Sequence, residues 1–279
     1  MKAVILAGGV GTRLREETEF RPKPMVEIGG RPILWHIMKI YAHHDITDFV
    51  LCLGYKGDVI RDYFLNYRYR RCDVTTTLGT NDVEVHNGHE EWGWRVTLAD
   101  TGPKTETAGR LRRIARYLDG DCFMATYGDG VADIDLHALL RTHRRSGKLI
   151  TVSAVRPSSR FGELSIHDGL VRTFEEKPQV SNSWINGGFF VMQREALDYA
   201  LGDEDKLENL LARLTGKHEV AVYEHSGFWQ CMDTLRESEL LNRMWNSGQA
   251  PWKMWERTEE NFELEAVGGR LSLEPGLSR

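Results

Sequence analysis

The sequence predicts an α/β fold with a doubly wound, mostly parallel sheet. A four-residue apolar run at residues 3–6 stands directly before a glycine-rich loop, and such runs are typical of parallel strands buried on both faces. Strand-like and helix-like segments alternate through most of the chain, as expected when helices connect parallel strands. Polar residues that could bind a ligand or take part in catalysis follow several of these strands. In this fold class ligands bind beyond the carboxyl ends of the strands.

Each expected element follows from its local pattern. Apolar runs of strand length predict strands at residues 3–6, 49–53, 122–126, 149–155, 184–192 and 219–223. Apolar residues at helical spacing predict helices at about 32–41, 59–64, 108–117, 135–146, 205–215 and 235–247. His167-Asp168-Gly169 is a good hairpin turn between two short strands.

Two segments depart from this alternation. Residues 66–100 contain the short runs 73–77, 83–85 and 94–98, which we expect to form an inserted antiparallel segment beside the main sheet. Residues 1–255 then make up one domain. Residues 256–279 are acidic and then glycine-rich, and we expect a loosely ordered tail or a contact with a neighbouring subunit.

Composition excludes several function classes. The chain has 279 residues with 41% hydrophobic and 28% charged residues, ordinary values for a globular protein. A net charge of −5 gives no electrostatic footprint for nucleic acid. The four cysteines are widely spaced, which argues against a disulfide framework and favours a reducing compartment. The first strand leaves no room for a signal peptide, and no apolar run approaches the ~20 residues needed to span a bilayer. We therefore expect a cytoplasmic protein without a membrane or nucleic-acid partner.

The loop after the first strand is the most informative motif. Residues 6–14 read Leu-Ala-Gly-Gly-Val-Gly-Thr-Arg-Leu, and Lys23-Pro24 follows. Closely spaced glycines let the backbone turn sharply and approach a ligand. Their N–H groups can converge on an anion, while Arg13 and Lys23 add positive charge. The run matches neither a Walker loop nor a dinucleotide fingerprint. An ordinary strand-to-helix turn is the alternative, but such a turn has no use for both cations.

Two aspartates are candidate metal ligands. Asp129 follows a predicted strand and lies between two glycines, and Asp233 lies at the end of an aromatic segment. Each also has a plainer role, Asp129 as a turn former and Asp233 as the N-cap of the helix that begins near Leu235. Two carboxylates brought together from distant strand ends would make a hard oxygen site for Mg²⁺. Sequence spacing leaves both roles open.

Further polar residues suggest a second substrate. Glu176 and Lys177 follow a predicted strand, either as solvated charges or as contacts for hydroxyls and an anionic group. Asn186 precedes two glycines, which indicates a bulge or close approach to a ligand. Arg110 could face a phosphate or a helix end. There is no Gly-x-Ser-x-Gly elbow and no His-Glu-x-x-His motif. That absence fits transfer to a phosphate nucleophile, which needs no general base.

Together these motifs resemble the signature of the sugar-1-phosphate nucleotidylyltransferase family. The glycine loop with Lys23-Pro24 carries the resemblance, and Glu176-Lys177-Pro178 and Asn186-Gly187-Gly188 look like the family's sugar-phosphate segments. The resemblance covers roughly residues 1–255. It is strongest to members that use CTP and glucose 1-phosphate, in residues 24–30, 32–38, 127–133 and 227–235. The chain departs from those relatives at Arg21, where lysine is common, and in the polar loop 103–108.

The resemblance implies a Rossmann-like nucleotidyltransferase fold, a homo-oligomer, and transfer of a cytidylyl group from CTP to α-D-glucose 1-phosphate. By position it implies that Arg13 neutralises the departing pyrophosphate, that Lys23 contacts a reacting phosphate, and that Asp129 and Asp233 bind Mg²⁺. The implied nucleotide contacts are Leu6, Ala7, Gly8, Gly9, Gly11, Thr12, Thr105, Arg110 and Gly128. The implied sugar-phosphate contacts are Gly162, Glu176, Lys177 and Asn186.

Two alternatives stay open. The same chemistry with dTTP or UTP differs only in base choice, which depends on backbone groups and loop shape. A catalytically silent, sugar-nucleotide-sensing subunit usually lacks the arginine, the lysine or a metal carboxylate. Arg13, Lys23, Asp129 and Asp233 are all present in this chain.

Overall fold

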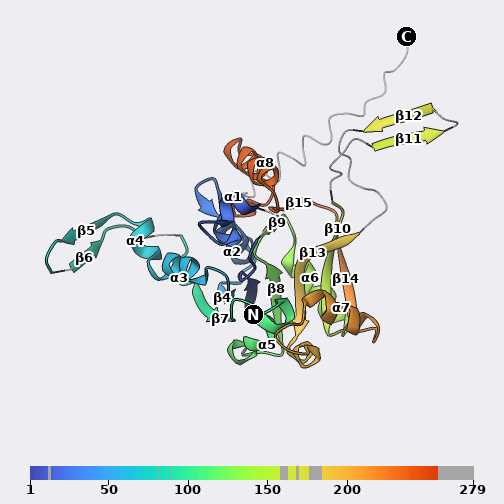
Figure 1. Cartoon of the computed structure of the whole chain (residues 1–279), viewed down its shortest axis with the longest axis horizontal. Helices are drawn as coiled ribbons and strands as arrows, with labels where there is room; N and C mark the ends of the chain where they lie inside the picture. The colour runs from blue at the N-terminus through green and yellow to red at the C-terminus, as the bar shows by residue number, and fades with distance from the viewer. Residues whose placement is uncertain are drawn as a thin grey trace, which may run out of the picture.

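A computed structural model of the chain describes residues 1–11, 14–80, 82–88, 90–157, 163–167, 170–175 and 184–256 (Figure 1). Several residues that the sequence analysis singled out lie outside this part of the chain. They are Thr12, Arg13, Gly162, Glu176, Lys177 and residues 257–279 of the tail.

A seven-stranded sheet forms the centre of the molecule. Its strands are β1 (Ala3–Leu6), β4 (Asp48–Leu53), β7 (Arg95–Asp100), β8 (Cys122–Tyr127), β10 (Ile150–Val155), β13 (Ile185–Gln193) and β14 (Val220–His225). The spatial order is β14-β10-β13-β8-β1-β4-β7. Only β13 runs antiparallel to its neighbours, β10 and β8. The expected mostly parallel sheet is confirmed.

Helices cover both faces of this sheet, which makes it doubly wound (Figure 1). Successive residues of a strand point to opposite faces, so Ile5 belongs to one apolar core and Val4 to the other. The first core includes side chains from α2 (Ile33–His43), α3 (Gly57–Leu65), α6 (Leu136–Ser146) and α8 (Leu235–Asn246). The second includes side chains from α5 (Thr107–Arg113), the 3₁₀ helix η4 (Arg194–Tyr199) and α7 (Leu207–Thr215). Burial on both faces explains why the central strands are continuously apolar.

The expected inserted segment is shorter than predicted. After the short helix α4 (Tyr67–Arg71), β5 (Val74–Thr77) and β6 (Asp82–Val85) form an antiparallel hairpin that extends away from the sheet (Figure 1). Our prediction that residues 94–98 belong to this insertion was wrong, because β7 pairs in parallel with β4 as an edge strand of the main sheet. A half-buried edge strand and a hairpin strand have the same alternating pattern. Trp94 packs on Phe49, with ring centroids 5.2 Å apart, and so holds β7 at the edge.

The remaining elements are short. Antiparallel pairs form between β2 (Glu27–Ile28) and β3 (Arg31–Pro32), between β9 (Gly130–Ala132) and β15 (Trp229–Cys231), and between β11 (Glu163–His167) and β12 (Leu170–Glu175). The last pair is the hairpin predicted around residues 167–169. The other short elements are α1 (Arg15–Thr18) and the 3₁₀ helices η2 (Lys23–Met25), η3 (Ala115–Tyr117) and η5 (Met254–Glu256).

The aromatic segment near the end of the described chain packs onto α2. Trp252 is fully buried, its ring stacks on Phe228 with centroids 5.6 Å apart, and its indole N–H points to Nδ1 of His36 at 3.4 Å. In the part of the chain that the structure describes, every helix is too short or too polar to cross a membrane.

Candidate nucleotide and sugar-phosphate site

The glycine loop follows β1 and is shaped by close contacts. A Cβ atom on Gly8 would overlap the guanidinium of Arg110, so a larger residue there would displace this arginine from its hydrogen bonds. Gly11 has a φ of +66°, a conformation that disfavours other residues. Among the described residues, no acceptor takes a hydrogen bond from the N–H groups of Gly8, Gly9 or Gly11. These donors are therefore available to an anionic ligand.

Lys23 reaches two carboxylates from the 3₁₀ turn η2. Its backbone is held between Pro22 and Pro24, and its side chain is largely buried. Nζ donates to Oδ2 of Asp129 at 2.6 Å and to Oδ1 of Asp233. Burial alone would lower the pKa of Lys23, but the two carboxylates raise it above its ordinary value. The lysine therefore stays charged and holds the two acids together.

Strand pairing brings the two aspartates together from distant parts of the sequence. Asp129 directly precedes β9, and Asp233 follows β15 by two residues. These strands pair with Cys231 opposite Gly130, and the N–H of Met232 donates to the carbonyl oxygen of Asp129 at 2.8 Å. The fold thus makes the convergence that spacing alone left open.

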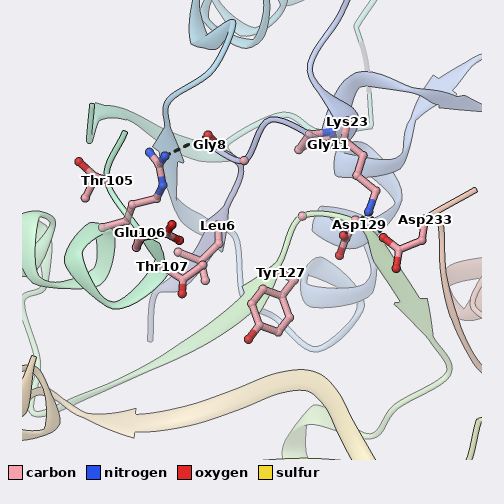
Figure 2. A pocket seen from close by; sticks show the side chains of 14 residues that line it. Leu6, Gly8, Gly11, Lys23, Thr105, Glu106, Thr107, Tyr127, Asp129 and Asp233 are labelled. Carbon is pink, nitrogen blue, oxygen red and sulfur yellow. Dashed lines mark hydrogen bonds and ion pairs between the residues drawn. The ribbon is translucent and has the colours of Figure 1, made fainter. Parts of the chain in front are cut away.

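Thr234 and Glu237 form a capping box at the start of α8. Thr234, rather than Asp233, is the N-cap of α8, and its hydroxyl accepts from the N–H of Glu237. The Glu237 carboxylate in turn accepts from the N–H groups of Asp233 and Thr234, at 2.8 and 2.9 Å. The plainer role that we considered for Asp233 is therefore filled by its neighbour. Its side chain points to Lys23 instead (Figure 2).

Arg110 fastens the glycine loop to the neighbouring strand end. The side chain comes from α5 and is buried. Nη2 donates to the carbonyl oxygen of Gly8 at 3.0 Å (Figure 2). Nη1 donates to the carbonyl oxygens of Leu53 at 3.0 Å and Gly102 at 2.8 Å, and to the Thr101 hydroxyl at 2.7 Å. Desolvation lowers the pKa of Arg110 from its ordinary value. The hydrogen bonds of the guanidinium therefore hold the glycine loop in position beside the end of β4.

A cavity of about 260 Å³ joins these groups (Figure 2). Its lining residues are Leu6, Gly8, Gly9, Gly11, Lys23, Pro24, Thr105, Glu106, Thr107, Arg110, Tyr127, Gly128, Asp129 and Asp233. Most described nucleotide contacts that the resemblance implies lie here. Ala7 does not line the cavity, since it is fully buried and its N–H donates to the carbonyl oxygen of Cys52 at 3.1 Å.

A second cavity of about 270 Å³ adjoins the first and shares Tyr127, Asp129 and Asp233 with it. Its other lining residues are Thr126, Gly130, Asn186, Gly187, Gly188, Phe189, Glu208, Trp229 and Cys231. The predicted sugar-phosphate residue Asn186 lies here, and its Oδ1 accepts from the N–H of Gly188 at 2.8 Å. Lys23 and the two aspartates therefore stand where the two cavities meet.

Sequence reasoning missed several residues of the second cavity. Glu208 lies in α7, and its carboxylate accepts a hydrogen bond from the Tyr127 hydroxyl at 3.2 Å. Trp229 donates from Nε1 to the carbonyl oxygen of Gly187 at 2.7 Å. Trp229 stands in the aromatic segment before Asp233, a signal that could have marked it. Glu208 has no local signal, because only the packing of α7 against α5, η4 and β14 brings it to the cavity.

The donor set at the junction suits a hard divalent cation. Asp129 and Asp233 supply carboxylate oxygens, and their side chains are 31% and 12% exposed, so both remain accessible from the cavities. No cluster of three or more His, Cys, Asp or Glu side chains that could hold a metal occurs within the described ranges. A cation held here would take its remaining ligands from substrate phosphates and water, as Mg²⁺ commonly does.

Comparison with known proteins identifies the family. Residues 2–235 match the family model described as nucleotidyl transferase. The chain belongs to the nucleotidyl transferase family. This confirms the family resemblance drawn from the glycine loop and Lys23-Pro24, and the chain is accordingly an enzyme of this family.

Some relatives of this nucleotidyl transferase are similar to it over almost their whole length. It is 52% identical over 258 residues to the glucose-1-phosphate cytidylyltransferase of Salmonella typhimurium, covering 92% of this chain and 100% of the relative. It is 43% identical over 257 residues to the probable glucose-1-phosphate cytidylyltransferase of Bacillus subtilis (strain 168), covering 91% of this chain and 100% of the relative. Among solved structures, HddC from Yersinia pseudotuberculosis complexed with GMP-PN is similar, with a TM-score of 0.64 and 21% identity over 88% of this chain and 99% of that chain. The structural likeness supports the fold.

Proposed function

We propose that this nucleotidyl transferase moves a cytidylyl group from CTP to α-D-glucose 1-phosphate and forms CDP-glucose and pyrophosphate. The high identity to a named glucose-1-phosphate cytidylyltransferase over its full length supports the choice of substrates. The observation that carries the chemistry is the position of Lys23, Asp129 and Asp233 at the junction of two adjoining cavities. Two phosphates, one from each cavity, would meet there.

The reaction needs positioning and charge more than acid–base chemistry. An oxygen of glucose 1-phosphate forms a bond to the α-phosphorus of CTP, while the bond from that phosphorus to the bridging oxygen breaks. Pyrophosphate leaves with the electron pair of the broken bond. The attacking oxygen is already anionic, so no general base is required. Lys23 holds positive charge beside the reacting phosphates.

The residues that line the two cavities support a separate binding site for each substrate. The unpaired N–H groups of the glycine loop face the first cavity, so we assign the triphosphate to them, with Leu6, Thr105, Arg110 and Gly128 around the nucleotide. We assign the sugar phosphate to the second cavity beside Asn186. The family resemblance adds Thr12 and Arg13 to the nucleotide contacts. It adds Gly162, Glu176 and Lys177 to the sugar-phosphate contacts.

We propose Mg²⁺ as the cofactor, held by Asp129 and Asp233. The paired carboxylates at the junction fit this ion, because hard cations prefer oxygen ligands. When bound, Mg²⁺ would supply positive charge against the charge that builds on pyrophosphate. In the absence of Mg²⁺, Lys23 neutralises the carboxylates of Asp129 and Asp233. In its presence, Lys23 contacts a substrate phosphate.

The test is pyrophosphate release with each of four nucleotides, CTP, UTP, dTTP and GTP, in the presence of glucose 1-phosphate. We expect the highest kcat/KM with CTP and no release when glucose 1-phosphate is omitted. A preference for dTTP or UTP would replace the proposed donor with the alternative one. No release with any nucleotide would favour the silent sensing subunit.

We also propose a homo-oligomer that works in the cytoplasm. Large apolar side chains are exposed at the end of α3 and around the β5–β6 hairpin, with Leu65, Leu78 and Trp92 at 69%, 91% and 79% exposure. Such residues are typical of contacts between subunits. Sedimentation velocity should show a species larger than one 32.0 kDa chain, and a purely monomeric profile would contradict the assembly.

A further inference from the structure

The end of the nucleotide cavity opposite Lys23 carries a carboxylate to which no role has yet been assigned. Glu106 directly precedes α5 and lines the cavity between Thr105 and Thr107. Its N–H donates to the carbonyl oxygen of Asp203 at 2.7 Å, and its carbonyl oxygen accepts from the N–H of Arg110 at 2.9 Å. The backbone of this residue is therefore fixed on both sides.

The Glu106 carboxylate interacts electrostatically with the Arg110 guanidinium. Glu106 occupies the N-cap position of α5 but makes no capping hydrogen bond. Its carboxylate forms no hydrogen bond or ion pair with any residue in the described part of the chain. The neighbouring Thr107 behaves differently, because its hydroxyl accepts from the N–H of Leu207 at 2.7 Å and so docks α7. The acceptor oxygens of Glu106 are left to the cavity.

The interaction between Arg110 and this carboxylate is electrostatic, because the hydrogen bonds of the guanidinium go elsewhere. Its two terminal nitrogens donate to the carbonyl oxygens of Leu53, Gly102 and Gly8 and to the hydroxyl of Thr101. Figure 2 shows the Glu106 carboxylate beside Leu6, across the cavity from Lys23. The free N–H groups of the glycine loop and Lys23 therefore lie toward one end of the cavity, and the Glu106 carboxylate lies toward the other.

This arrangement orients a nucleoside triphosphate. The free N–H groups of the glycine loop can bind the anionic oxygens of the triphosphate, whereas the Glu106 carboxylate repels them. The base then lies toward Glu106. An ionised carboxylate only accepts hydrogen bonds, so a base that meets it must present an N–H group. Cytosine presents an exocyclic amino group, where uracil and thymine present a carbonyl oxygen.

We propose that Glu106 is a specificity residue, which accepts a hydrogen bond from the exocyclic amino group of the nucleotide base and so selects CTP over UTP and dTTP. The inference rests on the proposed function, since it concerns the donor nucleotide of that reaction. With UTP, two oxygens with no hydrogen between them face each other in a partly buried site. Sites built for a donor reject analogues that lack it by large factors.

The test is the ratio of kcat/KM for CTP to kcat/KM for UTP in Glu106→Gln. The amide keeps an acceptor for cytosine and adds a donor for the uracil carbonyl. We expect the ratio to fall by about 10-fold to 100-fold, the range of a single hydrogen bond to a charged group. UTP should gain activity. The ratio in Glu195→Gln, an exposed carboxylate on η4 away from both cavities, should stay unchanged.

The outcomes separate this inference from the proposed function. A wild-type enzyme that prefers CTP, with a preference that survives Glu106→Gln unchanged, would overturn the role of Glu106 alone. A wild-type enzyme that uses no CTP would contradict the proposed function itself. If Glu106→Gln fails to fold, as judged by thermal unfolding, Glu106→Ala provides the same test. It should lower kcat/KM for CTP more than for UTP, and equal losses would overturn the proposal.

Discussion

Asp129→Asn should lower kcat by about 10²-fold to 10³-fold or more while the protein stays folded. The substitution keeps the shape of the side chain but removes one of the two negative charges that meet at Lys23. In the proposed mechanism, a divalent cation would lose a charged oxygen ligand beside the reacting phosphates. The fold persists because the Asp129 side chain is partly exposed and Asp233 still pairs with Lys23. Steady-state kinetics at several Mg²⁺ concentrations measure the effect.

The matched control is Asp198→Asn, an exposed aspartate on η4 that lines neither cavity. It should retain wild-type turnover. Thermal unfolding of both variants establishes that the folds are intact. Near-normal turnover of Asp129→Asn at saturating Mg²⁺ would remove Asp129 from the metal site.

Arg110→Ala should destabilise the protein even without ligand, by about 3 kcal/mol or more. The guanidinium joins the glycine loop, the end of β4 and the loop after β7 through four hydrogen bonds. The carbonyl oxygen of Leu53 still accepts from Thr101, and that of Gly8 still accepts from the N–H of Tyr55. The free energy of folding is therefore lost through the hydrogen bonds of the charged guanidinium and through the cavity that its removal leaves. In a chain of this size the apparent melting temperature should fall by roughly 5–10 °C. Affinity for CTP should fall as well, because the loop loses its brace.

Arg110→Lys separates bracing from simple charge. Lysine keeps the positive charge but lacks the planar fork that reaches several oxygens at once, so it should recover little of the stability. A residue that only contacted the nucleotide would behave differently. Its removal would leave the melting temperature of the ligand-free protein unchanged and raise only the KM for CTP, which would contradict the bracing role.

The fold could be predicted largely because central strands are buried on both faces. The runs at residues 3–6 and 49–53 are apolar without alternation, which is how a strand between two helix layers must be composed. The failure at β7 has the same physical origin. An edge strand is covered less completely, so its Val and Thr alternate as they do in an exposed hairpin, and local sequence does not distinguish the two.

The site could be predicted in its parts but not in its assembly. Glycines, a lysine and two aspartates are recognisable as chemical groups, but Lys23 meets partners 106 and 210 residues away. The pairing of β9 with β15 decides that meeting, and no local pattern encodes it. Arg110 was expected to face a phosphate or a helix end. The structure instead directs its donors to three backbone carbonyls and the Thr101 hydroxyl, and this depends on the glycine loop, the end of β4 and the loop after β7 folding around it.

Diffraction from crystals grown with CTP and Mn²⁺, an anomalous scatterer that substitutes for Mg²⁺, tests the central claim most directly. We predict one manganese ion coordinated by carboxylate oxygens of both Asp129 and Asp233 and by an oxygen of the α-phosphate. A manganese ion held by neither aspartate or by only one of them, with CTP bound in the same cavity, would contradict the account.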